Sequence, residues 1–219
     1  MTKEGEAAEP GSRGFAGGTR WWRTAPRPQI HEPDDPEPFQ AFARLESAEI
    51  YSSPWCGLRR DVVELPNGDP QEHHVFEVTN AVAVVPVLED GSILMLWQYR
   101  YPHGRSHWEI PAGRMNEDEH PPETARRELL EETGHAAGEL LELPGFFPTN
   151  GISAHYAHLF LALDCQPQGA ATPDASEQIL LRPFERQTVR ERLHRGTFAD
   201  GFTALSLFYA LGRLEALNR

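Results

Sequence analysis

Short apolar runs alternate with polar and turn-forming stretches along most of the chain, and this pattern separates a tail from a folded region. Residues 1–38 are rich in Gly, Pro and charge and follow neither the strand nor the helix period, so we expect a flexible tail. Trp21 and Trp22 lie in this tail and are costly to leave in water, so they pack on the domain or on a second subunit, or make only local contacts. We divide the remainder into a strand region, residues 39–80, and a main domain, residues 81–219.

Apolar runs of strand length, separated by turn residues, predict a sheet. Strand-like segments lie on either side of Pro66-Asn67-Gly68, which predicts a hairpin. The runs 81–87 and 93–100 flank Glu89-Asp90-Gly91-Ser92 in the same way, and the first run is apolar enough for a central strand. Further short strands are expected at 108–110, 155–163 and 178–184.

Three segments have helical spacing. Pro121 and Pro122 can open a helix and Gly134 can end it, which predicts a helix over residues 122–133. Residues 185–195 and 203–217 carry Leu, Phe and Ala at helical intervals. The order of strands, a helix, strands and helices predicts an α+β protein with a mixed β-sheet and helices on its faces.

The composition narrows the classes of function. A formal charge of -13 argues against binding nucleic acid through a broad basic face, because that mode needs Lys and Arg to replace condensed counterions. A small phosphorylated substrate is compatible with this charge, since bound divalent cations supply positive charge locally. Cys56 and Cys165 are the only cysteines, which suits a reducing compartment. We see no signal peptide or membrane span, and expect a soluble, cytoplasmic protein without membrane partners.

Three glutamates concentrate negative charge on the first expected helix. Glu128, Glu131 and Glu132 are three and four residues apart, so their carboxylates share one helix face. Like charges this close repel, and they are stabilised either by water and salt or by cations bound between them. The spacing alone leaves open both a solvated helix face and a metal site.

A fixed pattern of residues surrounds these glutamates. Gly113 is separated by five residues from Glu119, and Glu119 by seven residues from Arg127, which begins the run RELLEETG. This is the motif G-x5-E-x7-R-E-U-x-E-E-x-G-U, where U is aliphatic, and the chain resembles the Nudix hydrolase family through all seven fixed residues. His135 departs from the motif at its last position, which is usually aliphatic and packs beneath the motif.

The resemblance implies a Nudix-type α/β/α sandwich and a pyrophosphatase that uses Mg²⁺, with Mn²⁺ as a substitute. Hard cations held by carboxylates bring water to phosphorus and neutralise the charge that accumulates there. Glu128 and Glu132 are the implied catalytic glutamates. The implied metal ligands are the Ala112 carbonyl, Glu128, Glu131 and Glu132. The implied structural residues are Gly113, Glu119, Arg127 and Gly134, with Arg127 and Glu119 bracing the loop against the helix.

Segments outside the motif indicate a branch of this family. DVVELPNG, VVPVLEDGSILMLWQYRYPHG, WEIPAG and GTFADGFTALSLFYAL look like the ADP-ribose and nucleotide-sugar pyrophosphatases. That branch often forms homodimers through its N-terminal strands, so the resemblance implies a homodimer built by residues 39–80. It also implies that Trp108, Glu109 and Arg100 bind substrate, although Trp108 has a second interpretation as a core residue.

The segment after the motif departs from this branch. The branch commonly carries S-P-G followed four residues on by Glu, whereas this chain has Asn150 in place of the proline and His155 in place of the acid. The branch often places a catalytic Glu in a later loop, for which Glu177 is our first choice and Asp174 our second. Either residue has a plain alternative as a solvated loop carboxylate. We assign no site to His73, His74, His155 or His158.

The expected reaction is hydrolysis of the pyrophosphate bond of ADP-ribose or a nucleotide sugar, which gives a nucleoside monophosphate and a sugar phosphate. One alternative is a sensor that binds such a compound without useful hydrolysis, which the missing acid at His155 motivates. Another is a Nudix enzyme acting on dinucleoside polyphosphates. The NADH-cleaving and coenzyme A branches are disfavoured because their additional sequence signatures are absent.

Overall fold

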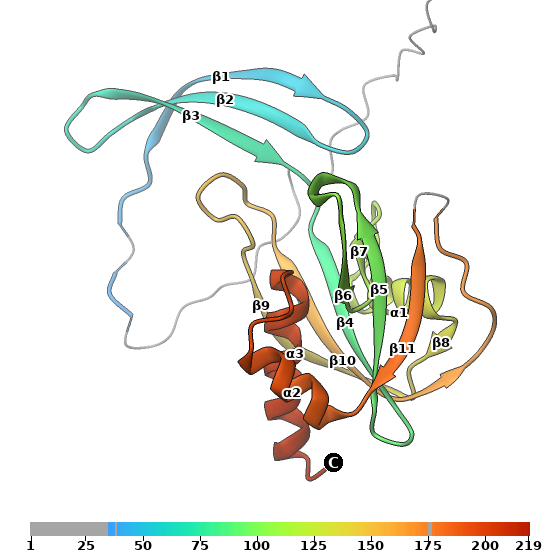
Figure 1. Cartoon of the computed structure of the whole chain (residues 1–219). Helices are drawn as coiled ribbons and strands as arrows, with labels where there is room; N and C mark the ends of the chain where they lie inside the picture. The colour runs from blue at the N-terminus through green and yellow to red at the C-terminus, as the bar shows by residue number, and fades with distance from the viewer. Residues whose placement is uncertain (1–34, 38, 175–176) are drawn as a thin grey trace, which may run out of the picture.

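The computed structural model describes residues 35–37, 39–174 and 177–219 (Figure 1). The predicted flexible tail, with Trp21 and Trp22, lies almost entirely outside these residues. The described chain forms two sheets, a small antiparallel one and a larger mixed one. None of its helices is long and apolar enough to cross a membrane.

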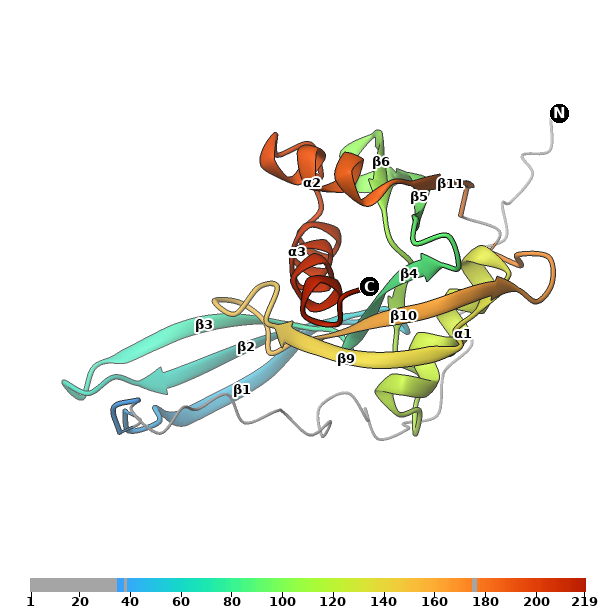
Figure 2. The ribbon, with the colours of Figure 1, turned by 90° about the horizontal axis from the view of Figure 1, so that it is seen from below.

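The small sheet has the order β1-β2-β3 and extends away from the rest of the molecule (Figures 1 and 2). Its strands are β1 (Ala43–Ser52), β2 (Gly57–Glu64) and β3 (Pro70–Glu77). The turn between β2 and β3 contains Gly68 at φ 87, and its amide donates a 2.9 Å hydrogen bond to the Leu65 carbonyl. The expected hairpin at this position is confirmed.

The larger sheet has the order β11-β5-β4-β10-β8, with β6 beside β5, β7 beside β4 and β9 beside β10. Its strands are β4 (Ala81–Leu88), β5 (Ile93–Arg100), β6 (Arg105–Glu109), β7 (Ala112–Arg114), β8 (His135–Ala136), β9 (Glu139–Phe146), β10 (Ala157–Pro167) and β11 (Ile179–Phe184). The pair β4–β10 is parallel and the other pairs are antiparallel. The predicted mixed sheet is therefore confirmed, with β4 as a buried central strand.

Helices cover both faces of this sheet (Figure 2). They are α1 (Pro121–Thr133), α2 (Arg186–His194) and α3 (Gly201–Ala216). Successive β4 side chains point to opposite faces, so Val82 and Val84 join a core cluster with Leu129 of α1. Ala83 and Val85 instead join the cluster that contains Leu207, Ala210 and Leu214 of α3. Burial of apolar side chains on both sides holds α1 and α3 in register with β4 and thereby positions the site.

The ends of α1 follow from its sequence. A proline at the first turn loses no helical hydrogen bond, and His120 and Glu123 form a capping box with the backbone. Gly134 ends the helix at φ 69, where its amide donates 2.8 Å to the Leu130 carbonyl. A Cβ at Gly134 would overlap the Gly169 carbonyl oxygen, so this position requires glycine for space as well as for φ.

Candidate active site

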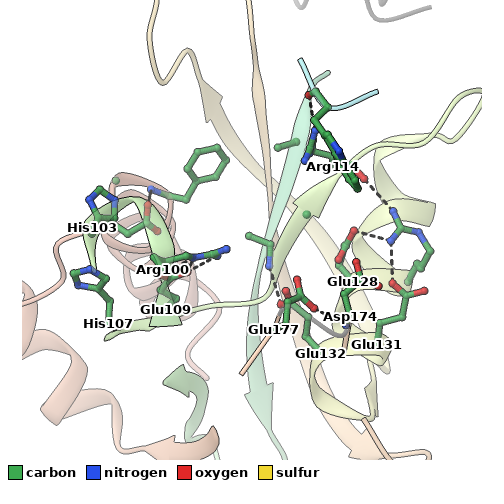
Figure 3. A pocket seen from close by; sticks show the side chains of 18 of the residues that line it. Arg100, His103, His107, Glu109, Arg114, Glu128, Glu131, Glu132, Asp174 and Glu177 are labelled. Atoms are coloured by element: carbon green, nitrogen blue, oxygen red, sulfur yellow. Dashed lines mark hydrogen bonds and ion pairs between the residues drawn. The ribbon is translucent and has the colours of Figure 1, made fainter. Parts of the chain in front are cut away.

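A cavity of about 960 Å³ opens between α1, the β5–β6 hairpin and the start of α3 (Figure 3). Ten of the residues expected from the sequence to take part in function line it: Arg100, Glu109, Ala112, Gly113, Arg127, Glu128, Glu131, Glu132, Asp174 and Glu177. The structure thus brings together the motif helix, its loop and the later acidic loop. Glu119 stands behind this wall, bonded to Arg127.

The carboxylates of α1 gather at one side of the cavity, as the labelled side chains in Figure 3 show. Glu128 and Glu132 are 8% and 2% exposed, and Glu131 is half-buried. The Ala112 amide donates 3.1 Å to Glu132 Oε2, which joins the loop to the helix. Burial of charged groups at this density demands compensation by cations or hydrogen-bond donors.

The pairing of β7 with β4 leaves the backbone N–H and C=O of Ala112 outside the hydrogen bonds of the sheet. The neighbouring sheet bonds run from Val84 to the Pro111 carbonyl and from Met115 to the Asn80 carbonyl. In an antiparallel pair such bonds occur at alternate residues, so Ala112, opposite Ala83, directs its N–H and C=O away from β4. The expected orientation of the Ala112 carbonyl toward the glutamates therefore agrees with the register of β7.

Gly113 allows α1 to approach the loop. A Cβ built on Gly113 would overlap the carboxylate of Glu128, although the backbone there has no positive φ. The motif glycine is thus required here for close packing and not for a left-handed backbone conformation.

Arg127 connects the loop and the helix through four carbonyl or carboxylate groups. Its Nε and Nη2 donate to Glu119 at 2.8 and 2.9 Å, and Nη2 also donates 3.1 Å to the Arg114 carbonyl. Its Nη1 donates to Glu128 at 2.6 Å and to Glu131 at 3.0 Å. These hydrogen bonds agree with the bracing that the resemblance implied, and those to Glu119 lower the pKa of that carboxyl to about 2.

The electrostatics of the cavity suit a hard cation. Burial, together with the nearby charges of Glu177 and Glu128, raises the pKa of Glu132 to about 9. Burial also raises the pKa of Glu128. Among the described residues, no three acidic, His or Cys side chains already converge as a metal cage. Arg127 donates hydrogen bonds to carboxylate oxygens of Glu128 and Glu131. The donors themselves, carboxylate and carbonyl oxygens, are those that Mg²⁺ and Mn²⁺ prefer.

The expected substrate residues separate into two groups. Arg100 lines the cavity, and it donates from Nη2 to Glu109 Oε2 at 2.6 Å and from Nε to Glu109 Oε1 at 3.1 Å. Trp108 is not brought to the cavity. Its ring packs 5.1 Å from that of Trp97 and 4.8 Å from that of Phe184, which agrees with its second interpretation as a core residue.

The acidic loop after β10 reaches the same glutamates. The Thr172 amide donates 2.8 Å to the Glu131 carbonyl, which anchors the loop on α1. Further along the chain, the Asp174 amide donates 2.9 Å to Glu177 Oε2, and the Glu177 amide donates 2.8 Å to the Asp174 carbonyl. Both candidates for the general base therefore lie in the cavity, and the influence of Glu177 on the pKa of Glu132 indicates their proximity.

No site was expected for His73, His74, His155 and His158, and all four lie outside the cavity. His155 packs 5.9 Å from the ring of Phe202, and burial lowers its pKa. His158 packs 5.0 Å from Tyr156. The structure brings other residues to the cavity that sequence reasoning missed: Trp55, His103, Arg105, His107, Arg114, Asp200 and Phe202. The alternation of side chains along the strand that contains Glu109 could have indicated two of them, Arg105 and His107.

Comparison with known proteins identifies the family. The NUDIX domain model matches residues 78–193. The chain belongs to the Nudix family. A second model, the nucleoside diphosphate sugar hydrolase N-terminal domain, matches residues 43–76. Together these matches confirm the family and the branch that the sequence motifs indicated.

Individual Nudix relatives cover different shares of this chain. An ADP-ribose pyrophosphatase from Bacillus subtilis is 40% identical over 118 residues, which are 54% of this chain and 64% of the relative. A second one, from Mycobacterium tuberculosis, is 35% identical over 129 residues, or 58% of this chain and 62% of the relative. The alignment thus spans less than two thirds of each of these two proteins. A methanol dehydrogenase activator from Bacillus methanolicus is 31% identical over 175 residues, or 80% of this chain and 94% of the relative.

A solved structure supports the fold. It is a crystal structure described as an ADP compounds hydrolase, with a TM-score of 0.75 over 84% of this chain and 100% of the other. The sequence identity is 20%, so the likeness concerns the fold alone. It confirms the Nudix-type arrangement of helices around a mixed sheet.

Proposed function

We propose that this Nudix protein hydrolyses the pyrophosphate bond of a nucleoside diphosphate linked to a sugar, most simply ADP-ribose or a nucleotide sugar, in a reaction that depends on a divalent cation. The observation that carries the proposal is the set of buried carboxylates on α1, facing one cavity together with the Ala112 loop. The relatives named as ADP-ribose pyrophosphatases support the choice of substrate class. The cavity volume of about 960 Å³ suits a ligand of this size.

In this proposal Glu128, Glu131, Glu132 and the Ala112 carbonyl hold Mg²⁺, with Mn²⁺ as a substitute. A bound divalent cation supplies charge neutralisation for the diphosphate and acidifies a nucleophilic water. Glu128 and Glu132 are the catalytic glutamates. Arg127, braced by Glu119, keeps the helix and the loop at a fixed separation.

Glu177 is proposed as the general base, with Asp174 as the second choice. Both line the cavity beside the α1 glutamates, on a loop anchored to Glu131. A carboxylate in this position can accept the proton of the attacking water. Arg100 and Glu109 are proposed to bind substrate from the opposite wall, where their ion pair presents donors and acceptors to the cavity.

We further propose a homodimer built through the β1–β3 sheet and a location in the cytoplasm. Large apolar side chains on β1, among them Leu45 and Ile50, are about half exposed in the single chain. Both cysteines are free thiols in the structure, in agreement with a reducing compartment. No nucleic-acid or membrane partner is proposed.

Hydrolysis of a panel of substrates tests the function. ADP-ribose, GDP-mannose, UDP-glucose, a dinucleoside polyphosphate and NADH are incubated with Mg²⁺ or Mn²⁺, and the nucleoside monophosphate is quantified. Glu132→Gln should lower kcat by about 1,000-fold or more, because it removes a metal-binding charge. Glu139→Gln is the matched control, since Glu139 is exposed on β9 outside the cavity.

Two outcomes would contradict the proposal. Wild-type turnover in Glu132→Gln would refute the metal assignment. Tight binding of ADP-ribose with only slow single-turnover cleavage by the wild type would indicate a sensor instead of an enzyme.

A further inference from the structure

The β5–β6 hairpin presents polar side chains to the cavity that the proposed metal chemistry does not use. Along β6, Arg105, His107 and Glu109 line the cavity, whereas Trp108 points into the core. This alternation is the ordinary period of a strand, in which every second side chain lies on one face. His107 therefore stands on the same face as Glu109, one step further from the sheet centre.

His107 has a polar neighbour directly across the hairpin. Its register partner on β5 is Gln98, and cross-strand partners place their side chains on the same face. Gln98 is only 2% exposed. Within the described part of the chain, neither Gln98 Oε1 nor His107 Nε2 has a hydrogen-bond partner, and both atoms are buried. Roughly nine in ten buried polar atoms are hydrogen-bonded in folded proteins, so two orphans on adjacent positions indicate a missing polar group.

The ion pair between Arg100 and Glu109 explains why Gln98 Oε1 and His107 Nε2 are covered. Arg100 lies two positions beyond Gln98 on the same strand face, opposite Arg105, while Glu109 lies opposite Leu96. To bond Glu109, the Arg100 side chain must therefore pass over the Gln98–His107 pair. The Arg100 side chain is 38% exposed, so it has room to move toward the cavity.

A second imidazole stands beside the first. The short 3-10 helix Tyr101–His103 ends at Gly104, whose φ of 60 turns the chain back into β6. As a result the His103 and His107 rings lie 5.7 Å apart, edge to face. Both rings line the cavity on the side opposite the α1 glutamates (Figure 3).

We propose that Gln98, His103 and His107 form a subsite for the hydroxyl groups of the sugar attached to the far side of the diphosphate; this inference rests on the proposed pyrophosphatase function. Gln98 Oε1 can only accept a hydrogen bond, so it requires a donor and disfavours a phosphate or carboxylate. An imidazole nitrogen can donate or accept according to its tautomer. A hydroxyl group satisfies both orphans at once, because it accepts from His107 and donates to Gln98.

The ion pair between Arg100 and Glu109 connects this subsite to the diphosphate. The two side chains offset each other's charge, and Arg105, exposed at the start of β6, is the other charged side chain of this wall. When Arg100 turns from Glu109 toward the diphosphate, it uncovers the Gln98–His107 pair for the sugar. Diphosphate binding and sugar recognition are therefore linked through one side chain.

A pair of substrates that differ only in the sugar tests the subsite. ADP-ribose is compared with the β-methyl ester of ADP, which keeps the nucleotide and the diphosphate and lacks the distal ribose. In the full-length protein with Mg²⁺, His107→Leu should raise KM for ADP-ribose about tenfold and leave KM for the methyl ester within about twofold, as expected for one lost hydrogen bond. kcat should change little for either compound, because the imidazole touches no reacting atom.

Three further variants sharpen the test. His107→Gln restores a nitrogen near the position of Nε2 and should recover most of the affinity for ADP-ribose. His103→Ala, at an exposed turn, should raise KM for ADP-ribose about threefold with no loss of folding. His194→Ala removes an exposed imidazole from α2, outside this cavity, and should change neither substrate.

Binding of methylene-bridged analogues, which cannot be cleaved at the diphosphate, separates this inference from the proposed function. If the wild type prefers the ADP-ribose analogue and His107→Leu loses this preference, the subsite is supported, even if neither parent compound is hydrolysed. Absence of hydrolysis would refute only the proposed pyrophosphatase function. Equal effects of His107→Leu on both ligands, or no effect on either, would overturn the subsite. So would equal affinity of the wild type for the two analogues.

Discussion

Gly113 lies so close to Glu128 that the methyl group of an alanine at this position would displace the Glu128 carboxylate. An added Cβ would overlap the end of the Glu128 side chain, which can rotate away, and no backbone atom is among its nearest neighbours. We therefore expect Gly113→Ala to lower kcat/KM by about 100-fold through misplacement of Glu128, while the free energy of unfolding changes by no more than about 1 kcal/mol. Steady-state kinetics and urea denaturation measure the two quantities.

Gly151→Ala is the matched control, because a Cβ there meets no atom within 4 Å. It should leave both activity and stability unchanged. A Gly113→Ala variant with wild-type activity would show that the Glu128 carboxylate is not needed where the structure places it.

Cys165 illustrates the effect of burial on a single thiol. It is 2% exposed in β10, and burial raises the pKa of its thiol to about 11. Since the thiolate is the reactive form, Cys165 should resist a disulfide reagent at about pH 8 in the native protein, while Cys56, less buried, reacts. A thiol titration should count one cysteine in buffer and two in denaturant; two rapid thiols in the native protein would contradict the buried position.

At the scale of elements, the Glu119–Arg127 ion pair ties the motif loop to α1. Hydrogen bonds from Arg127 lower the pKa of Glu119 from 4.5 to about 2. A lowered carboxyl pKa stabilises the fold at pH values above the unfolded pKa, and this contribution is lost as the pH falls through the folded value. Glu119→Gln should therefore cost about 1 kcal/mol of unfolding free energy at neutral pH, a modest value because the pair is partly exposed.

The difference in stability between wild type and Glu119→Gln should shrink between about pH 4.5 and pH 2. Denaturant titrations at several pH values across this window measure it. A difference that stays constant down to pH 2 would mean that the ion pair does not act through the ionised carboxylate.

The elements of the motif were predictable because each fixed residue has a local physical role. Pro121 begins α1 because a proline has no backbone N–H to leave unpaired there, and Gly134 ends it because a glycine accepts the left-handed conformation. The helix was therefore located from sequence within one residue. β9 was missed because Gly145, next to a proline, resembles a turn. In the structure that glycine permits close approach to the Ala157 carbonyl within the sheet.

The position of β1 and the sheet face on which the Trp108 side chain lies could not be predicted from the local sequence. Nearly every β1 residue is exposed, so the strand has no buried face to impose alternation on its sequence. The strand around Trp108 was expected, but only its register decides which of two neighbours faces the cavity, and sequence does not specify register without its partner. For the same reason the His103–His107 pair, which depends on a turn, emerged only from the structure.

At the scale of the whole molecule, the β1–β3 sheet stands apart from the main domain (Figure 1). Leu45 and Ile50 are 52% and 53% exposed, and both lie where the β1–β2 register shifts, so neither pairs with β2. A three-stranded sheet with this much exposed apolar surface has little core of its own, and a second subunit would cover it.

The proposed homodimer therefore predicts that Leu45→Asp combined with Ile50→Asp shifts the protein from dimer to monomer at micromolar concentration, because two charges would have to be buried in the interface. Sedimentation equilibrium measures the change. Leu180→Asp is the matched control, since Leu180 is equally exposed on β11 of the other sheet and should leave the mass unchanged. A monomeric wild type, or a double variant that remains dimeric, would show that these side chains do not form the interface. If substrate is bound between subunits, the monomeric variant should also lose activity at concentrations where its main domain remains folded.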